Sequence, residues 1–504
     1  MRSGLFLILF SVISLNLFGQ DLAGFVNPFI GTTNYGTTNP GAVLPNGMMS
    51  IAPFNVMGSE ENRFDKDKQW WSTPYSHENK FFTGFSHVNL SGVGCPESGS
   101  LLLMPTSGEL NVNYEEYGSG YSGEQASPGY YTNRLTKYGI VTEVSATTRT
   151  SIARFIFPKG RANILMNLGE GLTNESGAWM RRISDTEIEG MKVLGTFCYN
   201  PQAVFPIYFV MRVNKQPVAA GYWKKQREMA TEAAWDSTAG TRKIYTRYGR
   251  DIAGDDIGAY FSYDVEADET IEVQIGISFV STANARENLE AEQNGFQFDK
   301  IRTAARESWE KELARVRIEG GTGDQKVIFY TALYHALIHP NLLNDVNGQY
   351  PAMESDKVLT SGTDRYTVFS LWDTYRNVHQ LLALLYPEKQ LNMVRSMVGM
   401  YKESGWLPKW ELYGRETLTM EGDPAIPVIV DSWMKGLRDF DVEAAYEAMY
   451  KSATTGGRDN FLRPDNDDYL RLGYVALREK YDNSVSHALE YYIADNALSK
   501  FAAA

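Results

Sequence analysis

The sequence has little cysteine and no excess of positive charge, and each shortage excludes a class of protein. Only Cys95 and Cys198 occur in 504 residues, which is too few for a disulfide scaffold. Their redox state stays open, because two distant cysteines cannot be paired from sequence alone. The 61 acidic residues outnumber the 48 basic ones, the net charge is −13, and no run of Lys or Arg interrupts the excess. Such a chain repels phosphate backbones, so we expect no nucleic-acid partner.

The sequence also lacks the short motifs of several common enzyme classes. No glycine run follows a strand and opens a helix, so neither a phosphate-binding loop nor a dinucleotide fingerprint is present. No spacing of His, Cys and Asp forms a closed metal site. Cys95 has no His/Asn partner pattern of a thiol protease, so a packing role is favoured over a nucleophile.

One apolar run opens the chain. Arg2 precedes an apolar stretch that ends at the small residue Gly19. This pattern predicts a secretory signal peptide over residues 1–20. The run is shorter than the roughly 20 residues of a spanning helix, although an uncleaved membrane anchor is the alternative. No cysteine follows the run to carry a lipid, so we expect a secreted or periplasmic protein without an anchor.

The length and composition predict more than one folded domain. A chain of 504 residues can bury more than one hydrophobic core. Its 43% hydrophobic and 22% charged residues are typical of globular proteins. Residues 21–282 read as an antiparallel β-sandwich. In the clearest strand, apolar residues alternate with Glu, Gln, Gly and Ser from Ile271 to Phe279, which predicts one buried and one wet face.

The pattern becomes helical near Ala283. Residues 283–320 are rich in Ala, Glu, Arg and Leu at helical spacing and are predicted to be a helical linker. Residues 321–504 keep the helical period and predict stacked helices, an incomplete (α/α)6 toroid. In the first helix, which ends before Pro340, one face is expected to hold Phe329, Leu333, Ala336 and Leu337. Further helices are expected at about 372–386, 388–404, 426–437, 441–456 and 484–503. The last reaches Ala504 without a stop signal, so we expect the chain to end inside a domain.

Segments dense in aromatic, polar and glycine residues are expected to carry function, because binding groups concentrate on loops. One of them places Trp372, Asp373 and Arg376 at a helix start. The carboxylate could accept hydrogen bonds from two sugar hydroxyls while Trp372 stacks on the ring. The alternative is a helix N-terminal charge beside a packed tryptophan. Another segment supplies carboxylates near Trp406 and Trp410, most of which we expect to be solvated. They are Glu411, Glu416, Glu421, Asp423 and Asp431.

A second candidate site surrounds His87. This residue lies in a Gly-rich segment with Asn89, Cys95 and Glu97, which we interpret as a loop. His87 could donate a hydrogen bond to a sugar or bind a metal. The alternative is a histidine that only stabilises a turn.

Five ordered motifs resemble those of glycoside hydrolase family 92, whose members are calcium-dependent, inverting, exo-acting α-mannosidases. The V-N-P-F-I-G-T motif matches Val26–Thr32, and G-F-S-H-x-x-L-S-G-x-G matches Gly84–Gly94. The Y-T-A-L-Y-H motif matches Tyr330–His335, F-S-L-W-D-T-Y-R matches Phe369–Arg376, and G-x-L-P-x-W matches Gly405–Trp410. The resemblance implies a β-sandwich, helical linkers and an (α/α)6 toroid, with the active site in the cleft between them.

The resemblance also implies roles for individual residues. It places Trp372 and Asp373 in the subsite of the terminal mannose, with the loop from His87 to Glu97 reaching in from the sandwich. Residues 94–97 depart from some family members, which leaves the linkage preference open. We assign no catalytic or metal-binding residue in this chain. The predicted substrate-binding residues are His87, Cys95, Glu97, Trp372, Asp373, Arg376 and Trp410.

Two motifs of the family are missing from the sequence. The family's general acid lies in a Y/H-x-E-G-n-x-W motif and its base in a G-D/N-x-D-x-G-x-M-S-x-W motif, with calcium ligands nearby, and neither motif occurs. The complete enzyme would protonate the leaving oxygen with the acid and activate water with the base, while calcium held the mannose hydroxyls. We therefore expect this chain to hold a sugar and to be inactive by itself.

The predicted function is an exo-α-mannosidase that removes terminal α-linked mannose from glycans, with calcium as cofactor and α-1,2 as the favoured linkage. Two alternatives stay open. One is another (α/α)6 glycosidase or phosphorylase, and the other is a non-catalytic secreted glycan-binding protein, which the aromatic loops alone would permit.

Overall fold

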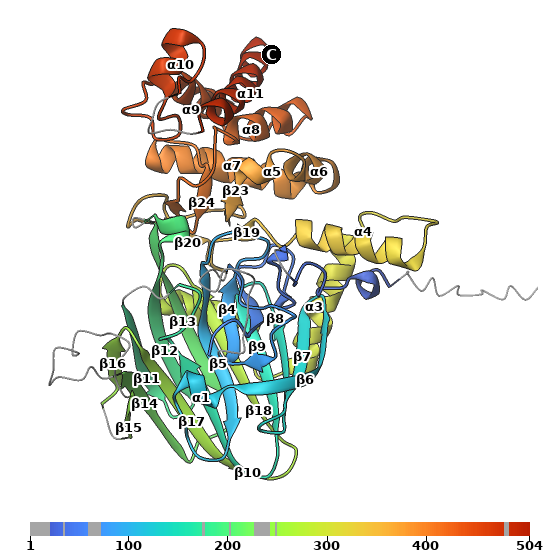
Figure 1. The fold of residues 1–504 in the computed structure, drawn as a ribbon, viewed down its shortest axis with the longest axis vertical. Coiled ribbons are helices and arrows are strands. Elements are labelled where there is room, and N and C mark those ends of the chain that lie inside the picture. Colours follow the sequence, from blue (N-terminus) through green and yellow to red (C-terminus); the bar gives the residue numbers. More distant parts are fainter. Residues whose placement is uncertain are drawn as a thin grey trace, which may run out of the picture.

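The structure is a computed structural model that describes residues 21–33, 36–58, 72–173, 177–200, 203–225, 242–246, 249–477 and 483–504. The predicted signal peptide, residues 1–20, lies outside the described residues. Two sheets form the lower body of the molecule in Figure 1, and helices α5 to α11 form the upper body. This arrangement confirms the predicted order of an antiparallel β-structure followed by helices. Among the described residues, no helix is long and apolar enough to span a membrane.

All strand pairs in the two large sheets are antiparallel. The first sheet has the order β1 (Ala42–Val43), β2 (Ser50–Phe54), β4 (Gly84–Asn89), β5 (Ser98–Ser107), β10 (Gly160–Asn167), β17 (Ile257–Val265), β14 (Ala219–Lys225), β15 (Arg242–Tyr245). The second has the order β16 (Asp251–Gly254), β11 (Ala178–Ser184), β12 (Glu187–Gly195), β13 (Val204–Val213), β18 (Glu269–Ser278), β9 (Thr150–Phe157), β8 (Ile140–Ala146), β7 (Tyr130–Leu135), β6 (Ser119–Ser127), β3 (Phe81–Phe82). The described residues of this part also form short helices, namely η1 (Ala23–Phe25), α1 (Tyr114–Tyr117) and η3 (Phe197–Tyr199).

Strand β18 shows where the alternating pattern was sufficient and where it was not. The predicted apolar face from Ile271 to Phe279 is buried in the sandwich core. The other face was expected to be wet, but Gln274 and Ser278 are also buried. Helix α2 (Thr282–Glu292) covers this second face, and it lies so close that a Cβ on Gly276 would be 2.5 Å from a backbone oxygen of the helix. The strand is therefore buried on both sides.

The predicted linker consists of α2 and α3 (Phe298–Leu313), which both lie along the second sheet. Helix α4 (Gly323–Ala336) follows and packs against α3 and η1. Its buried face differs slightly from the expected one. Tyr330, Leu333 and Tyr334 are buried, whereas Phe329 is only half-buried. Two large tyrosines occupy the core side of this helix, so the face is rotated relative to the prediction.

The remaining helices match the predicted ones, except that the single helix predicted at about 372–386 is divided into α5 and α6. They are α5 (Leu371–Thr374), α6 (Val378–Leu385), α7 (Pro387–Ser404), α8 (Ala425–Met434), α9 (Val442–Thr454), α10 (Asn466–Leu472) and α11 (Ser484–Ala503). Helix α8 is central, since it packs against α6, α7 and α11. Sequence reasoning missed α10. It also missed three small sheets: β19 (Asn341–Leu342) with β22 (Tyr366–Thr367), β20 (Gln349–Pro351) with β21 (Val358–Thr360), and β23 (Phe369–Ser370) with β24 (Trp410–Leu412) and β25 (Arg415–Glu416).

These small sheets connect the two bodies, because Tyr350 and Trp410 pack in the sandwich core while Tyr366 and Phe369 pack in the helical core. Tyr413, in the turn between β24 and β25, stacks on Phe279 of the sandwich with ring centres 4.3 Å apart. Asp345 accepts hydrogen bonds from Ser278, 2.7 Å, and from the amide of Asn288, 2.6 Å. Burial raises the pKa of Asp345, although its hydrogen bonds oppose that shift. We call this contact region the junction.

Candidate functional site

The first candidate element is the turn that follows β23. Trp372 and Asp373 lie in α5, and Arg376 follows within one further turn. Trp372 is half-buried against the helical core, whereas Asp373 and Arg376 are exposed. The Ser370 hydroxyl donates a hydrogen bond to the Asp373 carboxylate. The Arg376 guanidinium carbon lies 5.1 Å from the centre of the Trp372 ring, within cation–π range. The structure thus places an accessible carboxylate beside an aromatic plate.

The second candidate element is the loop between β4 and β5, which carries Cys95 and Glu97. Cys95 is disulfide-bonded to Cys198 in η3. This bond fixes the redox state that the sequence left open, and it agrees with a packing role for Cys95. Glu97 is fully buried and accepts hydrogen bonds from the backbone of Ser98, 2.7 Å, and the hydroxyl of Thr173, 3.2 Å. The loop is therefore held tightly at its C-terminal end.

His339, which sequence reasoning missed, holds the other end of this loop. Its Nε2 accepts a hydrogen bond from the backbone N–H of Ser91, 3.1 Å, and its Nδ1 lies 2.6 Å from Oδ1 of Asn341. Burial lowers the pKa of His339 to about 4, so the ring is neutral and Nδ1 carries the proton. Nothing in its sequence surroundings indicated this partner, because the two residues are 248 positions apart.

Trp410 lies between the two candidate elements. It is only 2% exposed, and its ring centre is 4.3 Å from that of Phe197, the neighbour of Cys198. In the small sheet, Trp410 pairs with Ser370, which in turn contacts Asp373. A continuous series of contacts therefore leads from the loop of Cys95 to the turn of Asp373. Trp410 supports both elements from within the core rather than presenting a surface.

His87 has a different position from the one we expected. It lies in strand β4 rather than in a loop, and its side chain is fully buried. Nδ1 lies 2.7 Å from the carbonyl oxygen of Leu101, and burial lowers the pKa of His87 to about 4. The glycines around it misled the sequence interpretation, since they shape the ends of a buried strand. In this position His87 is a core residue of the sandwich and does not reach the surface.

The carboxylates after Trp406 are mostly engaged rather than solvated. Glu411 is fully buried and bonded to the hydroxyl of Thr367, 2.9 Å, and the backbone of Gly414, 2.7 Å, and burial raises its pKa to about 8. Glu416 is also buried and accepts hydrogen bonds from three backbone N–H groups. Asp431 pairs with Lys435 one turn along α8. These side chains stabilise the hairpin and helix that carry them.

The described residues contain no clear calcium site. Among them, no group of three or more His, Cys, Asp and Glu side chains is placed to hold a metal ion. Calcium requires six to eight oxygen ligands. The buried carboxylates near the junction already accept hydrogen bonds from the protein. The described residues therefore do not fit a calcium ion.

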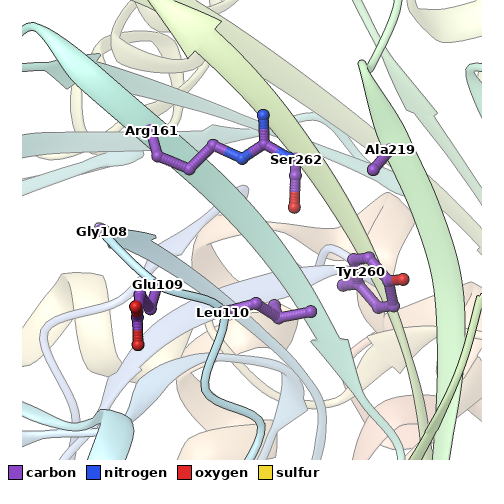
Figure 2. Close-up of a pocket in the computed structure, with 7 residues that line it drawn as sticks. All are labelled: Gly108, Glu109, Leu110, Arg161, Ala219, Tyr260 and Ser262. Carbon is purple, nitrogen blue, oxygen red and sulfur yellow. The ribbon is translucent and has the colours of Figure 1, made fainter.

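A hollow of about 540 Å³ opens at the far end of the sandwich. Figure 2 shows its lining, in which the side chain of Leu110 extends toward Tyr260. The lining residues are Gly108, Glu109, Leu110, Arg161, Ala219, Tyr260 and Ser262. Strand β5 begins beside Glu97 and ends beside Gly108, so roughly 30 Å of extended chain separates this hollow from the candidate loop. It is not the site that the sequence predicts.

Two models of one protein family match nearly all of the chain after residue 24. A family model described as the glycosyl hydrolase family 92 N-terminal domain matches residues 25–278, and one described as the catalytic domain of that family matches residues 284–504. The chain belongs to glycosyl hydrolase family 92. This finding confirms the resemblance inferred from the five motifs.

Solved members of family 92 have the same fold. The family 92 α-mannosidase BT3965 of Bacteroides thetaiotaomicron, described in complex with mannoimidazole, is 30% identical, with a TM-score of 0.84 over 96% of this chain and 61% of that protein. The inverting mannosidase BT2199 of the same organism is 26% identical, with a TM-score of 0.80 over 95% of this chain and 62% of that protein. A protein of Arthroderma benhamiae described as an uncharacterized secreted glycosidase is 25% identical over 94% of this chain and 59% of its own length. The chain thus spans about three fifths of these relatives.

Proposed function

We propose that this family 92 chain binds the terminal mannose of α-linked mannosides and belongs to an exo-acting α-mannosidase. The observation that carries the proposal is the exposed Asp373 carboxylate beside the half-buried Trp372 ring, next to the junction. Mannose is the proposed sugar because BT3965, a similar family member, is described as an α-mannosidase and was solved with mannoimidazole. Arg376 and the loop of Cys95 and Glu97 would complete the surroundings of the sugar.

The chemistry of the turn suits a sugar ring. A carboxylate can accept hydrogen bonds from two neighbouring hydroxyls, and an indole face covers the C–H side of the ring. The Nε1 donor of Trp372 is buried and has no hydrogen-bond partner within the described part of the chain, so the exposed part of the indole is what a sugar would contact. His87 and Trp410 lie too deep for direct contact in this arrangement, and their proposed contribution is to support the site.

Hydrolysis requires groups that the junction does not offer. An inverting glycosidase needs an acid and a base far enough apart to admit a water molecule. Glu97, Glu411 and Glu416 are buried in the described structure and bonded to the protein, which suits them to a structural role. We propose that the 504-residue chain binds the sugar without cleaving it, and that cleavage uses an acid and a base that this sequence does not contain.

Four finer features belong to the same proposal. The linkage is proposed to be α-1,2, and the active enzyme to depend on calcium, although no step above involves the ion. The signal pattern of residues 1–20 supports export to the periplasm or the medium, as does the description of the Arthroderma relative as secreted. The division into residues 21–282, 283–320 and 321–504 is proposed as the domain organisation.

A titration of the purified 504-residue protein with mannoimidazole tests the binding site. We expect saturable binding that weakens by about 10- to 100-fold in Asp373→Ala, the range expected for charge-assisted hydrogen bonds. Asp439→Ala is the matched control, because that carboxylate is also exposed but pairs with Arg395 on α7. Equal weakening in both variants, or none in Asp373→Ala, would remove Asp373 from the site.

Assays on mannobioses test the remaining features. The 504-residue protein should show no hydrolysis of α-1,2-, α-1,3- or α-1,6-mannobiose, since an acid and a base each contribute roughly 10²- to 10⁴-fold. Binding should be tightest for the α-1,2 compound, and a chelator should leave binding by this chain unchanged. Cleavage that is lost in Asp431→Asn would instead place a catalytic group in α8.

A further inference from the structure

We infer that Glu490 of α11 is a positioning residue for the sugar-binding turn, acting on Trp372 through Arg376 and Tyr375. The inference rests on the proposed function, because it gives a role to the orientation of Trp372. Glu490 is distant in sequence from the turn and is not in any of the five family motifs.

The Glu490 carboxylate accepts hydrogen bonds from both polar side chains that directly follow α5. The Tyr375 hydroxyl donates to Oε2 of Glu490, 2.7 Å, and the Arg376 guanidinium donates to Oε1, 2.8 Å. The two donors are adjacent in sequence and lie 115 and 114 residues before Glu490. The Glu490 side chain is only 10% exposed. Because both oxygens are occupied in a largely buried place, the carboxylate holds the two donors in a single arrangement.

Arg376 transmits this arrangement to Trp372. Its guanidinium carbon lies 5.1 Å from the Trp372 ring centre and 4.8 Å from the Tyr375 ring centre. About half of the Arg376 side chain is exposed, so without an anchor it would sample many rotamers. Trp372 has no hydrogen bond at Nε1 among the described residues. The anchored cation and the helical core therefore hold the half-buried indole in one orientation.

Neighbouring residues hold Glu490 itself in place. Gly422 lies against it, and a Cβ added there would be 2.5 Å from the Glu490 Cβ. Gly422 also has a φ of +76°, a conformation that favours glycine. One turn earlier on α11, His487 forms ion pairs with Glu421 and, at 2.7 Å, with Asp465. The loop of residues 420–424 and the start of α11 thus form a rigid base for the carboxylate.

The same helix offers a matched control. Asp495 accepts hydrogen bonds from a guanidinium and a tyrosine hydroxyl, those of Arg463 and Tyr469, both at 2.8 Å. Neither partner belongs to the turn of α5. Asp495 therefore has the same kind of anchoring contacts as Glu490, but the two side chains that it anchors lie outside the turn.

The test compares Glu490→Ala with Asp495→Ala in the 504-residue protein. Mannoimidazole binding, measured by calorimetry, should weaken by about tenfold or more in Glu490→Ala and by less than about twofold in Asp495→Ala, although both should lower the melting temperature. Glu490→Gln should bind with intermediate affinity, since its carbonyl can still accept one of the two hydrogen bonds. In a Trp372→Ala background, Glu490→Ala should cause no further loss.

A readout without ligand separates this inference from the proposed function. Acrylamide quenching of Trp372, taken as the difference from Trp372→Phe, should increase in Glu490→Ala and Glu490→Gln but not in Asp495→Ala. Unchanged quenching in the Glu490 variants, or equal loss of binding in both alanine variants, would overturn the positioning role. A third outcome separates the two proposals. If the wild-type protein binds no mannoimidazole but quenching still increases in the Glu490 variants, the sugar site is refuted and the positioning of Trp372 by Glu490 is supported.

Discussion

The two sides of the junction are held by histidines whose pKa values shift in opposite directions. On the sandwich side, His339 is neutral and its Nε2 accepts a hydrogen bond from the loop that carries Cys95. On the helical side, the pKa of His487 is raised by its hydrogen bond to Glu421 and by its contact with Asp465. A covalent bond reinforces the first side and ion pairs reinforce the second. The two sides should therefore respond to different perturbations.

The largest effect is expected from breaking the ion pairs of the helical side. Arg463 is fully buried and pairs with Asp423, 2.9 Å, and Asp495, 2.8 Å. Arg463→Met leaves the buried Asp423 carboxylate without its cation, which should cost about 3 to 5 kcal/mol. Urea unfolding monitored by tryptophan fluorescence measures this loss. The exposed pair of Lys402 and Asp441 is the comparison, since solvent screens that pair and Lys402→Met should cost far less than Arg463→Met.

The next effect should come from breaking the covalent bond of the sandwich side. Replacing Cys95 and Cys198 together by serine should cost about 2 to 4 kcal/mol, because the bond closes a long loop in the unfolded chain. Urea unfolding with and without a reductant measures the difference. Reductant should lower the unfolding free energy of the wild type toward that of the double variant and should leave the value of the double variant unchanged. If complete reduction leaves the unfolding free energy of the wild type unchanged, the disulfide bond contributes nothing to stability.

Lowering the pH should reduce folding stability through the protonation of His339 on the sandwich side. Its folded pKa of about 4 lies below the ordinary value of 6.5, so its contribution is complete above pH 6.5 and is lost as the pH falls through about 4. The expected loss is about 3 kcal/mol. The difference in unfolding free energy between wild type and His339→Gln, followed from pH 7 to 4, isolates this contribution. A difference that stays constant over this range would contradict the conclusion that a neutral His339 holds the loop.

Raising the pH should reduce the contribution of His487 to folding stability. The expected loss is smaller, about 1 kcal/mol. Its folded pKa lies above 6.5, so its contribution is complete below pH 6.5 and is lost as the pH rises through the folded value. Melting temperatures from pH 6 to 9 should fall more steeply for the wild type than for His487→Gln. Parallel curves would mean that the contacts with Glu421 and Asp465 add no net stability.

Local patterns predicted the elements of the fold because each depends on nearby residues. The alternation from Ile271 to Phe279 was sufficient to find β18, and helical spacing located α7 and α11. The alternation did not show that α2 covers the second face of β18, because that contact depends on how the linker folds back. Short strands such as β23 have too few residues to carry a pattern of their own.

The candidate site was only partly accessible to the same reasoning. Trp372, Asp373 and Arg376 share one turn, so a local motif was sufficient to bring them together. His87 looked like a loop residue because glycines surround it, yet burial in β4 decides its environment. The partners of His339 and Glu490 are 248 and about 115 residues away, and no spacing rule connects such positions.

A crystal structure of the protein with mannoimidazole would show whether the turn of α5 binds the sugar. We expect the sugar ring against Trp372, with an Asp373 carboxylate oxygen within hydrogen-bond distance of a ring hydroxyl and with Arg376 still bonded to Glu490. Ligand bound elsewhere, for example in the hollow lined by Glu109 and Tyr260, with the turn of α5 empty, would contradict this expectation.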